Sequence, residues 1–475
     1  MKRDRHFLFW VILIISFLSH INTSAQDFDK DIFAKRRQIL MEKMGDGIAV
    51  FLNSSHAIRS KDVSYYPFRT NSDFYYLSGF EDPDAAFLLL PNADKKFIMF
   101  VRPKNAISSM WFGDVPGIEG AMQIYGADTA YALDEFPEVL HSYLQEKKIY
   151  YDINDERFSK VINAAPDKSI DVNNIIHEMR VIKDSVEIEL IRKAVEISCK
   201  AQLEAMKAIQ PGMFEYEVAA IFSYIFEING SHSKAYESLV AAGKNSTIYH
   251  YSDVTGKAED GDLVLMDMGA EFQNYTSDIT RIIPANGKFT KEQREVYEIV
   301  LEMEKVVIEK LKPGNKLYDC TKVSEEIAKE GLFKLGLITD EKTIWQHYLY
   351  YYPFIGHSVG LDVHDVGDFG NYFAGGRVLE PGMVFALEPN LYIGENLIDG
   401  FRFNVMQKFS ISKEEVDAFL GDIYPVFEKY KEIAARVEDD ILITENGNEI
   451  LSDRLPRTVA EIEKVMTQKS FLNEE

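Results

Sequence analysis

The chain has 475 residues, of which 46% are hydrophobic and 27% are charged, and its formal net charge is −24. This composition is typical of a globular protein, and the length predicts two domains. An acidic chain without a Lys/Arg cluster is unsuited to binding nucleic acid, and two cysteines, Cys199 and Cys320, exclude a disulfide framework.

Residues 1–25 have the layout of a secretory signal peptide. Basic residues stand among the first five positions, an apolar run covers residues 7–18, and Thr-Ser-Ala at 23–25 precedes Gln26. An apolar core of about a dozen residues is short for the roughly 20 that span a bilayer, which favours cleavage over an uncleaved anchor. We therefore expect an exported protein, periplasmic or secreted, with no stable membrane span after cleavage.

Residues 26–170 are predicted to form a first domain of the α/β class. Helical or loop-like segments separate four strand candidates, at residues 47–52, 87–90, 96–101 and 148–153. Residues 65–80 form a block rich in aromatic rings, which packing alone could explain.

Residues 171–475 are predicted to form a second domain of the α+β class. Two of its helices are predicted by a capping box at the start and a Pro-Gly pair at the end: Asp184 with Glu187 before Pro211, and Thr290 with Gln293 before Pro313.

The stretch 263–281 is predicted to be a β-hairpin that carries two aspartates. Pairing around a turn at 272–273 would place Asp267 directly opposite Asp278, with Cβ atoms roughly 4.5 to 5.5 Å apart. Facing like charges must share a proton, stay hydrated or hold cations. A pair of metal ions roughly 3.5 to 4 Å apart fits that gap, and solvated turn residues are the alternative.

Further donors follow downstream. His357 and His364 stand on either side of a glycine, Gly360. Glu388 ends an apolar strand, and Glu438 precedes another. Each alone has an ordinary explanation, because single histidines and acids at strand ends are commonly hydrogen-bonded or solvated. Together the order Asp, Asp, His, Glu, Glu, each on a strand or at its end, indicates a metal site.

These positions and their surroundings resemble the pita-bread metallopeptidases, the fold shared by methionine aminopeptidase, aminopeptidase P and prolidase. The resemblance rests on the aspartate hairpin and on the motifs GHSVGLDVHD, LEPGMVFALEP and ARVEDDILIT, and it covers residues 180–450. The block YYPFRTNSDFYYLSGFEDPDA and the tetrapeptide Met110-Trp111-Phe112-Gly113 resemble the amino-terminal domain of aminopeptidase P. The implied architecture is an α+β pita-bread (creatinase/aminopeptidase) catalytic domain preceded by an α/β aminopeptidase P domain.

The resemblance implies a site for two divalent metal ions with five ligands: Asp267, Asp278, His357, Glu388 and Glu438. Asp278 and Glu438 would bridge the two ions. Four carboxylates with one imidazole form a hard, oxygen-rich set, which suits Mn²⁺ best, with zinc, cobalt and iron as alternatives.

The resemblance also implies roles for the residues around the metals. A hydroxide between the ions would attack the carbonyl carbon before the scissile bond, and Glu388 would shuttle the proton. His364 would stabilise the developing oxyanion, and His250 would contact the peptide near the leaving nitrogen. Arg436 would pair with site carboxylates or with substrate.

The implied function is that of an Xaa-Pro aminopeptidase, acting on peptides with proline in second position, and a homo-oligomer is expected. Two features depart from aminopeptidase P. Pro353 replaces a histidine that many relatives carry four residues before the ligand histidine, and Glu388 and Glu438 lie 50 residues apart, which is closer to prolidase. An Xaa-Pro dipeptidase is therefore the first alternative. A non-catalytic pita-bread binding protein, or a metal-free amidinohydrolase like creatinase, is the second.

Overall fold

The computed structural model describes residues 30–61, 64–144, 148–161, 168–353 and 356–473, and the expected signal peptide lies outside these ranges. The chain divides into two compact units, the first ending at Ile176 and the second starting at His177. Both cysteines are buried and free. None of the helices in the described ranges has the length and apolar character that a bilayer crossing requires.

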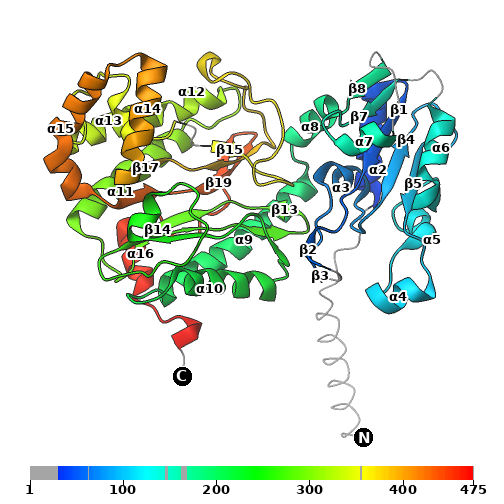
Figure 1. The fold of residues 1–475 in the computed structure, drawn as a ribbon, viewed down its shortest axis with the longest axis horizontal. Helices are drawn as coiled ribbons and strands as arrows, with labels where there is room; N and C mark the ends of the chain where they lie inside the picture. The colour runs from blue at the N-terminus through cyan, green and yellow to red at the C-terminus, as the bar shows by residue number, and fades with distance from the viewer. Residues whose placement is uncertain (1–29, 62–63, 145–147, 162–167, 354–355, 474–475) are drawn as a thin grey trace, which may run out of the picture. The chain divides into compact units, whose positions relative to one another are not determined.

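The first unit is built on a six-stranded mixed sheet (Figure 1). In sheet order its strands are β6 (Thr129–Ala132), β5 (Phe97–Val101), β4 (Ala86–Leu89), β1 (Ile48–Leu52), β7 (Ile149–Tyr151) and β8 (Ser169–Asp171). The four predicted strands are confirmed as β1, β4, β5 and β7. A short hairpin, β2 (Ile58–Ser60) with β3 (Ser64–Tyr65), stands outside the sheet.

Helices pack on both faces of this sheet, as an α/β layer requires. The side chains of Ile98 and Phe100 join Phe136 of α6 (Phe136–Tyr143) in one hydrophobic cluster. Phe97 points to the other face because side chains alternate along a strand, and it lies 3.9 Å below the guanidinium of Arg37 in α2 (Lys30–Met44). The remaining helices of this unit are α4 (Ala106–Phe112), α5 (Gly117–Gln123), α7 (Glu156–Val161) and the start of α8 (Asn173–Val181).

The middle of the aromatic block, residues 65–80, folds as the short helix α3 (Ser72–Ser78). The Asn71 side chain accepts a hydrogen bond from the Phe74 N–H at its start, and Gly79 ends it in the left-handed conformation (φ 65°). The Phe74 ring is fully buried, and the Tyr76 ring is buried with the Arg36 guanidinium 4.2 Å from its centroid. The rings from Phe74 to Phe80 therefore serve packing within the first unit, whereas Tyr65 and Tyr66 are exposed.

The second unit combines small antiparallel sheets with long helices (Figure 1). The first sheet contains β10 (Leu239–Ala242), β11 (Leu263–Asp267) and β14 (Thr280–Pro284), and the second contains β15 (Gly356–Ser358), β16 (Val384–Leu387), β19 (Asp439–Thr444) and β20 (Gly447–Ile450). Two further groups are β9 (Ser233–Lys234), β12 (Ala270–Phe272) and β13 (Tyr275–Thr276), and the pair β17 (Asn390–Ile393) with β18 (Ile433–Arg436). The helices are α9 (Ser185–Ala208), α10 (Glu215–Ile228), α11 (Lys291–Ile308), α12 (Leu317–Thr321), α13 (Val323–Leu335), α14 (Ile398–Phe409), α15 (Lys413–Tyr430) and α16 (Val459–Met466).

Both predicted capping boxes are present. The Asp184 carboxylate accepts from the N–H groups of Val186 and Glu187 at the start of α9. At the start of α11 the Thr290 hydroxyl accepts the N–H of Gln293, and the Gln293 side-chain oxygen accepts the N–H of Thr290. Local signals of this kind need no tertiary context, which is why they can be identified from sequence.

The aspartate hairpin exists, but its predicted register is wrong. Gln273 (φ 49°) and Asn274 (φ 66°) both adopt left-handed conformations, so the turn lies one residue later than expected. Phe272 therefore pairs with Tyr275, and Asp267 faces Thr280. Asp278 precedes Thr280 by two residues and so does not lie directly opposite Asp267. Since side chains repeat every two residues, this slip keeps both aspartates on one side of the hairpin.

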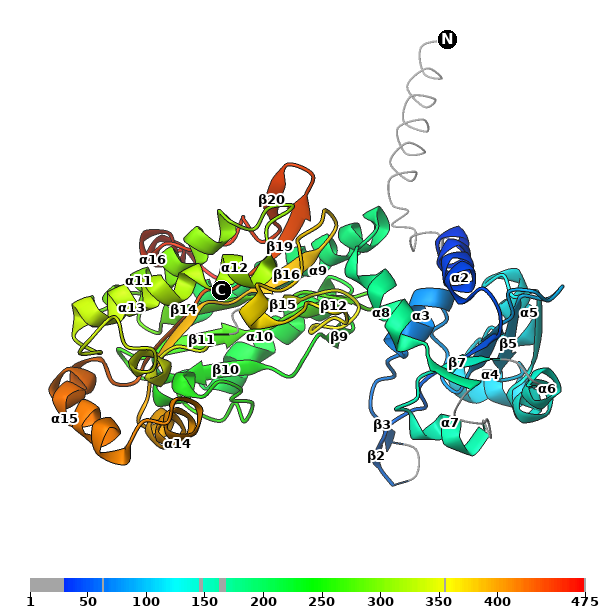
Figure 2. The same ribbon diagram turned by 90° about the horizontal axis from the view of Figure 1, so that it is seen from above.

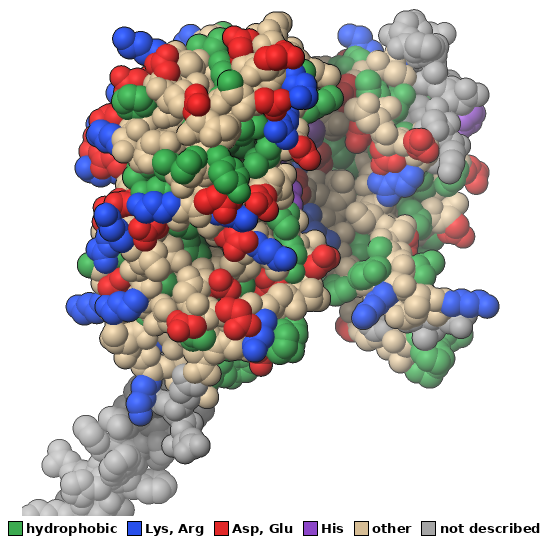
Figure 3. All heavy atoms as spheres, turned by 60° about the vertical axis from the view of Figure 1, so that its left-hand side comes forward, with side chains coloured by type: hydrophobic (Ala, Val, Ile, Leu, Met, Phe, Trp, Pro, Cys, Tyr) green, Lys and Arg blue, Asp and Glu red, His purple; other side chains and the backbone are tan. Residues whose placement is uncertain are grey.

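The long segment between Glu388 and Glu438 contains two helices, α14 and α15, which lie beside each other at the edge of the second unit (Figure 2). A capping box of Ser412 with Glu415 starts α15. On the face of this unit shown in Figure 3, acidic and basic side chains are interspersed. The negative charge of the chain is thus not gathered into one patch on that face.

Candidate active site

The five predicted ligands are carried by different strands of the second unit. Asp267 is the last residue of β11, and Asp278 stands just before β14. His357 is the middle residue of β15, which pairs with β16, and Glu388 follows the end of β16. Glu438 lies between β18 and β19. Pairing of these short strands brings residues from four distant sequence regions to one place.

The ligands and His364 form three overlapping groups, and within each group the candidate donor atoms lie within 4.8 Å of one another. The groups are Asp267, Asp278 and Glu438; His357, Glu388 and Glu438; and Asp278, His357 and His364. The same residues line a cavity of about 720 Å³, together with the two other predicted site residues, His250 and Arg436. The structure thus brings all eight predicted site residues together.

Tyr236 connects the two aspartates. Its hydroxyl oxygen lies 2.6 Å from Oδ1 of Asp267 and 2.6 Å from Oδ1 of Asp278. A hydroxyl has one proton to donate, so it can satisfy only one of these carboxylates, and the other needs a proton or a cation. This geometry fits a site built for positive ions.

Burial makes three carboxylates of the site, those of Asp267, Glu388 and Glu438, hard to ionise. Burial, followed by the charge of Asp278, raises the pKa of Asp267 to about 7, although Arg436 opposes the shift. Burial and the charges of Asp278 and Glu388 hold the pKa of Glu438 well above its usual range. Burial also raises the pKa of Glu388. Divalent cations would offset this repulsion, and the oxygen-rich donor set suits them.

Arg436 is the cation that the protein itself provides. Its Nη1 lies 2.6 Å from Oδ2 of Asp267, and its Nε lies 3.6 Å from Oε2 of Glu388. The side chain is buried, and β18 presents it toward the site. Arg436 thus forms a hydrogen-bonded ion pair with Asp267 and a longer ion pair with Glu388.

The two histidines of the GHSVGLDVHD motif are stacked. Their ring centroids lie 4.0 Å apart with an interplanar angle of 26°. Burial disfavours a charged His357 ring, but the carboxylates of Asp278 and Glu388 outweigh it and raise the pKa of His357 to about 9. Burial and the neighbouring His357 charge lower the pKa of His364. His364 is the more exposed of the two rings. At neutral pH it is thus the better candidate for a neutral group that donates a hydrogen bond to substrate.

A buried ion-pair cluster anchors the turn that carries His364. The adjacent Asp365 pairs with Arg180, and its Oδ2 lies 2.9 Å from Nζ of Lys183. Burial acts to raise the pKa of Asp365, but the charges of Lys183 and Arg180 outweigh it and hold that pKa below its usual value. Asp362, on the same turn, also contacts Arg180 but is 38% exposed at its side chain.

Three residues that support the site were missed by the sequence analysis. Tyr236 stands in a segment without periodic pattern, so its contact with the aspartates becomes visible only in three dimensions. Thr280 donates its hydroxyl proton to Glu438, and Asp440 accepts the N–H of Asp278 at 3.0 Å. The run of three acids that ends at Asp440, immediately before an apolar strand, could have signalled its burial.

Comparison with known families agrees with this geometry. Residues 189–445 match metallopeptidase family M24, and residues 33–151 match the N-terminal domain of aminopeptidase P. The chain belongs to metallopeptidase family M24. The expected pita-bread fold with an aminopeptidase P N-terminal domain is thereby confirmed, and the complete donor set argues against a non-catalytic protein.

Curated relatives match along nearly the whole chain. The Xaa-Pro aminopeptidase of Escherichia coli (strain K12) is 34% identical over 462 residues, which cover 93% of this chain and 98% of that protein. The Xaa-Pro aminopeptidase of Haemophilus influenzae is 36% identical over 447 residues, covering 92% and 97%.

Solved structures give the same result. Pseudomonas aeruginosa aminopeptidase PepP aligns with a TM-score of 0.81 and 33% identity, covering 92% of this chain and 98% of that one. E. coli aminopeptidase P with the inhibitor Pro-Leu aligns with a TM-score of 0.81 and 34% identity, covering 93% and 99%.

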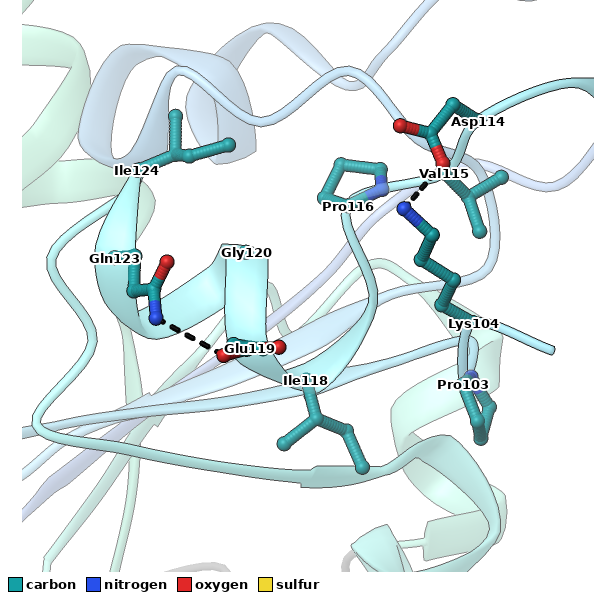
Figure 4. Close-up of a pocket in the computed structure, with 10 residues that line it drawn as sticks. All are labelled: Pro103, Lys104, Asp114, Val115, Pro116, Ile118, Glu119, Gly120, Gln123 and Ile124. Atoms are coloured by element: carbon teal, nitrogen blue, oxygen red, sulfur yellow. Dashed lines mark hydrogen bonds and ion pairs between the residues drawn. The ribbon is translucent and has the colours of Figure 1, made fainter. Parts of the chain in front are cut away.

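A second cavity, of about 580 Å³, lies in the first unit (Figure 4). It opens between α5 and the segment around Lys104 and Asp114, which form an ion pair. The described residues of its lining include no histidine and two acids, Asp114 and Glu119, and the Glu119 carboxylate accepts a hydrogen bond from the Gln123 side chain. This cavity therefore lacks the clustered donors of the candidate active site.

Proposed function

We propose that this family M24 member is an Xaa-Pro aminopeptidase, which hydrolyses the bond between the first residue of a peptide and a proline in second position. The observation that carries the proposal is the complete set of five metal donors in one cavity with His250, His364 and Arg436. Similarity to Xaa-Pro aminopeptidases along nearly the whole chain supports this substrate class.

Asp267, Asp278, His357, Glu388 and Glu438 would hold two divalent ions, and Asp278 and Glu438 each belong to two of the three donor groups. Mn²⁺ is the proposed metal because four of the five donors are hard carboxylates. When bound, such ions supply Lewis acidity and lower the pKa of water toward about 7.

The protein's own groups then divide the remaining work. Glu388, whose pKa is raised by burial, accepts the proton that the attacking water loses and returns it to the leaving nitrogen. His364 donates a hydrogen bond to the oxygen of the attacked carbonyl group as negative charge develops there. His250 contacts the leaving side of the peptide. Arg436 and Tyr236 keep Asp267 in place.

Proline in second position needs a dedicated enzyme for a physical reason. The nitrogen of an Xaa-Pro bond is tertiary and has no N–H, so peptidases that read an extended backbone handle it poorly. The aromatic rings of Tyr249 and Tyr352 and the aliphatic side chain of Val363 line the cavity and give it apolar surface for the proline ring.

An Xaa-Pro dipeptidase is the second candidate, because the 50-residue spacing from Glu388 to Glu438 is closer to prolidase. Incubation of residues 26–475 with Mn²⁺ and three substrates separates the two functions: an Xaa-Pro peptide, an Xaa-Pro dipeptide, and the same peptide with Ala for Pro. Mass spectrometry should show loss of one residue from the longer Pro peptide. Cleavage of the dipeptide alone would establish the dipeptidase, and preference for the Ala peptide would refute both.

We further propose that the protein is exported and acts in the periplasm or outside the cell, after cleavage following Ala25. The support is the layout of residues 1–25, with a basic start, an apolar run and small residues before Gln26. N-terminal sequencing of protein recovered from its natural source should begin at Gln26. Recovery of the intact Met1 terminus would contradict the proposal.

Self-association through the first unit is also proposed. Helix α4 exposes Ile107, Met110 and Trp111 at 69%, 72% and 69%, an apolar surface that monomers rarely leave open. Light scattering should give a mass above that of one chain, and Trp111→Glu should lower it. A wild-type mass equal to one chain would exclude the oligomer.

A further inference from the structure

A second cavity in the catalytic unit adjoins the active site. It has a volume of about 640 Å³, and we call it the α14 pocket because Gly400, Asn404 and Lys408 of α14 line it. Tyr249 and Tyr352 line both this pocket and the active-site cavity, with ring centroids 5.8 Å apart. The two cavities therefore share a wall made of two aromatic side chains.

Both departures from aminopeptidase P meet at the α14 pocket. Helix α14 belongs to the long segment between Glu388 and Glu438, and Pro353, which replaces a histidine, is also part of the lining. Residues from both departures thus line one pocket that adjoins the active-site cavity.

The two cavities differ in charge. Five acids line the active-site cavity, namely Glu237, Asp267, Asp278, Glu388 and Glu438. Among the described residues that line the α14 pocket there is no acid, and the one charged side chain is Lys408. The Lys408 ammonium group lies 4.9 Å from the centroid of the Tyr348 ring and 5.4 Å from that of the Phe409 ring. A cation in this position, in a chain of net charge −24, suits a ligand that carries a carboxylate.

Substrate geometry determines which part of a peptide this pocket can hold. An enzyme that releases a single residue has only that residue on the amino side of the scissile bond. All residues after the proline lie on the leaving side, and they are the part of a longer substrate that can extend past the Tyr249–Tyr352 wall into the adjoining pocket. We propose that the α14 pocket binds the residues that follow proline in a short peptide, with Lys408 pairing with its terminal carboxylate. This inference rests on the proposed aminopeptidase function.

The walls of the pocket also indicate which residues it prefers. Tyr348, Tyr351 and Phe409 give it aromatic surface, and Asn404 and Gln407 offer amide groups. Apolar or aromatic side chains after the proline should therefore raise kcat/KM through a lower KM, because ground-state contacts far from the reacting atoms act mainly on binding.

A glycine on α14 allows the pocket to be filled selectively. A Cβ atom added at Gly400 meets no atom within 4 Å, and the same holds for Gly421 on α15, which does not line the pocket. Gly400→Phe should lower kcat/KM for Ala-Pro-Phe-Ala at least about tenfold, with turnover of Ala-Pro-amide unchanged within about twofold. Gly421→Phe, the matched control, should leave both substrates within about twofold of wild type.

The proposed role of Lys408 is tested with two substrates that differ only in the charge of their C-terminus. Lys408→Met should lower kcat/KM about two- to fivefold for Ala-Pro-Phe-Ala with a free carboxylate, the size expected for an exposed ion pair, and should not affect its C-terminal amide. Equal losses for acid and amide, or an unchanged tetrapeptide rate in Gly400→Phe, would overturn the proposal. If Gly400→Phe lost activity on both substrates, the acid-against-amide comparison in Lys408→Met would decide.

Failure of the function itself gives a different result. Wild-type protein without activity on any Xaa-Pro substrate would remove the proposed function and the inference together. Wild-type protein that cleaves these substrates, with variants that show no dependence on length or terminal charge, would remove the inference alone.

Discussion

Arg436 and Asp267 form a buried ion pair at the centre of the site, with Nη1 of the arginine 2.6 Å from Oδ2 of the aspartate. Their side chains are each 5% exposed, and 169 residues of sequence separate them. The pair joins β18 to β11, so it links the strand that precedes Glu438 to the strand that carries Asp267.

Removal of this arginine should damage both stability and catalysis. Arg436→Ala leaves a buried carboxylate without its partner, which costs about 3 to 5 kcal/mol of unfolding free energy. Loss of the orientation of Asp267 and Glu388 should lower kcat about 100-fold. Urea unfolding and steady-state kinetics measure the two effects.

Arg192→Ala provides the control for that substitution. Arg192 pairs with Glu449 at the surface, where the side chains are 32% and 45% exposed. This variant should lose no more than about 1 kcal/mol. Equal destabilisation of both variants would show that the burial of the Arg436 pair does not matter.

Stabilisation by metal should depend on pH. The folded-state pKa of Asp267 is raised to about 7 from its ordinary value of 3.8, so the stability that its neutral form provides is complete below pH 3.8 and is lost as pH rises through 7. Divalent ions replace those protons and also the proton of His357, whose pKa is raised to about 9. Mn²⁺ should therefore raise Tm more at pH 8 than at pH 6. Equal shifts at both pH values would contradict this account of the carboxylates.

The Asp365 cluster should support the position of His364. Asp365 is 1% exposed at its side chain and pairs with Arg180 and Lys183, so Asp365→Asn should cost about 3 kcal/mol or more and lower kcat. Its pKa is held below the usual value, so its stabilising effect should be present above the pKa of the unfolded chain and lost as pH falls through the folded-state pKa. Chemical denaturation from pH 7 down to pH 3 tests this sign.

Asp362→Asn is the comparison for Asp365. This residue touches the same arginine but is 38% exposed at its side chain, and its substitution should cost less than about 1 kcal/mol. If Asp362→Asn lowered kcat as strongly as Asp365→Asn, the buried pair would not be what positions His364.

The sequence correctly predicted features that depend only on residues close to one another in the chain. The capping boxes at Asp184 and Thr290, and the strands of the first sheet, follow from local hydrogen bonding and apolar runs. The hairpin register was missed because the turn depends on left-handed backbone at both Gln273 and Asn274. Asn adopts left-handed backbone more readily than most residues, so Asn274 was the residue from which the position of the turn could have been predicted.

The ligand set could be proposed because each residue lies in a motif that resembles a known family. The residues that hold the ligands in place could not, because their roles depend on contacts across the fold. Tyr236 reaches Asp278 across 42 residues of sequence, and Asp440 reaches the Asp278 N–H across 162. No spacing rule predicts such pairs.

We propose that Asp267, Asp278, His357, Glu388 and Glu438 would hold two divalent ions that this chain needs to act as a peptidase. The most direct test titrates Mn²⁺ into chelator-treated residues 26–475 while metal content and turnover of an Xaa-Pro peptide are measured together. We predict that activity rises until about two ions are bound per chain. Asp278→Ala should keep the circular dichroism spectrum of the wild type but bind fewer ions and lose turnover. Full turnover by protein without detectable metal, or near wild-type turnover by Asp278→Ala, would contradict the account.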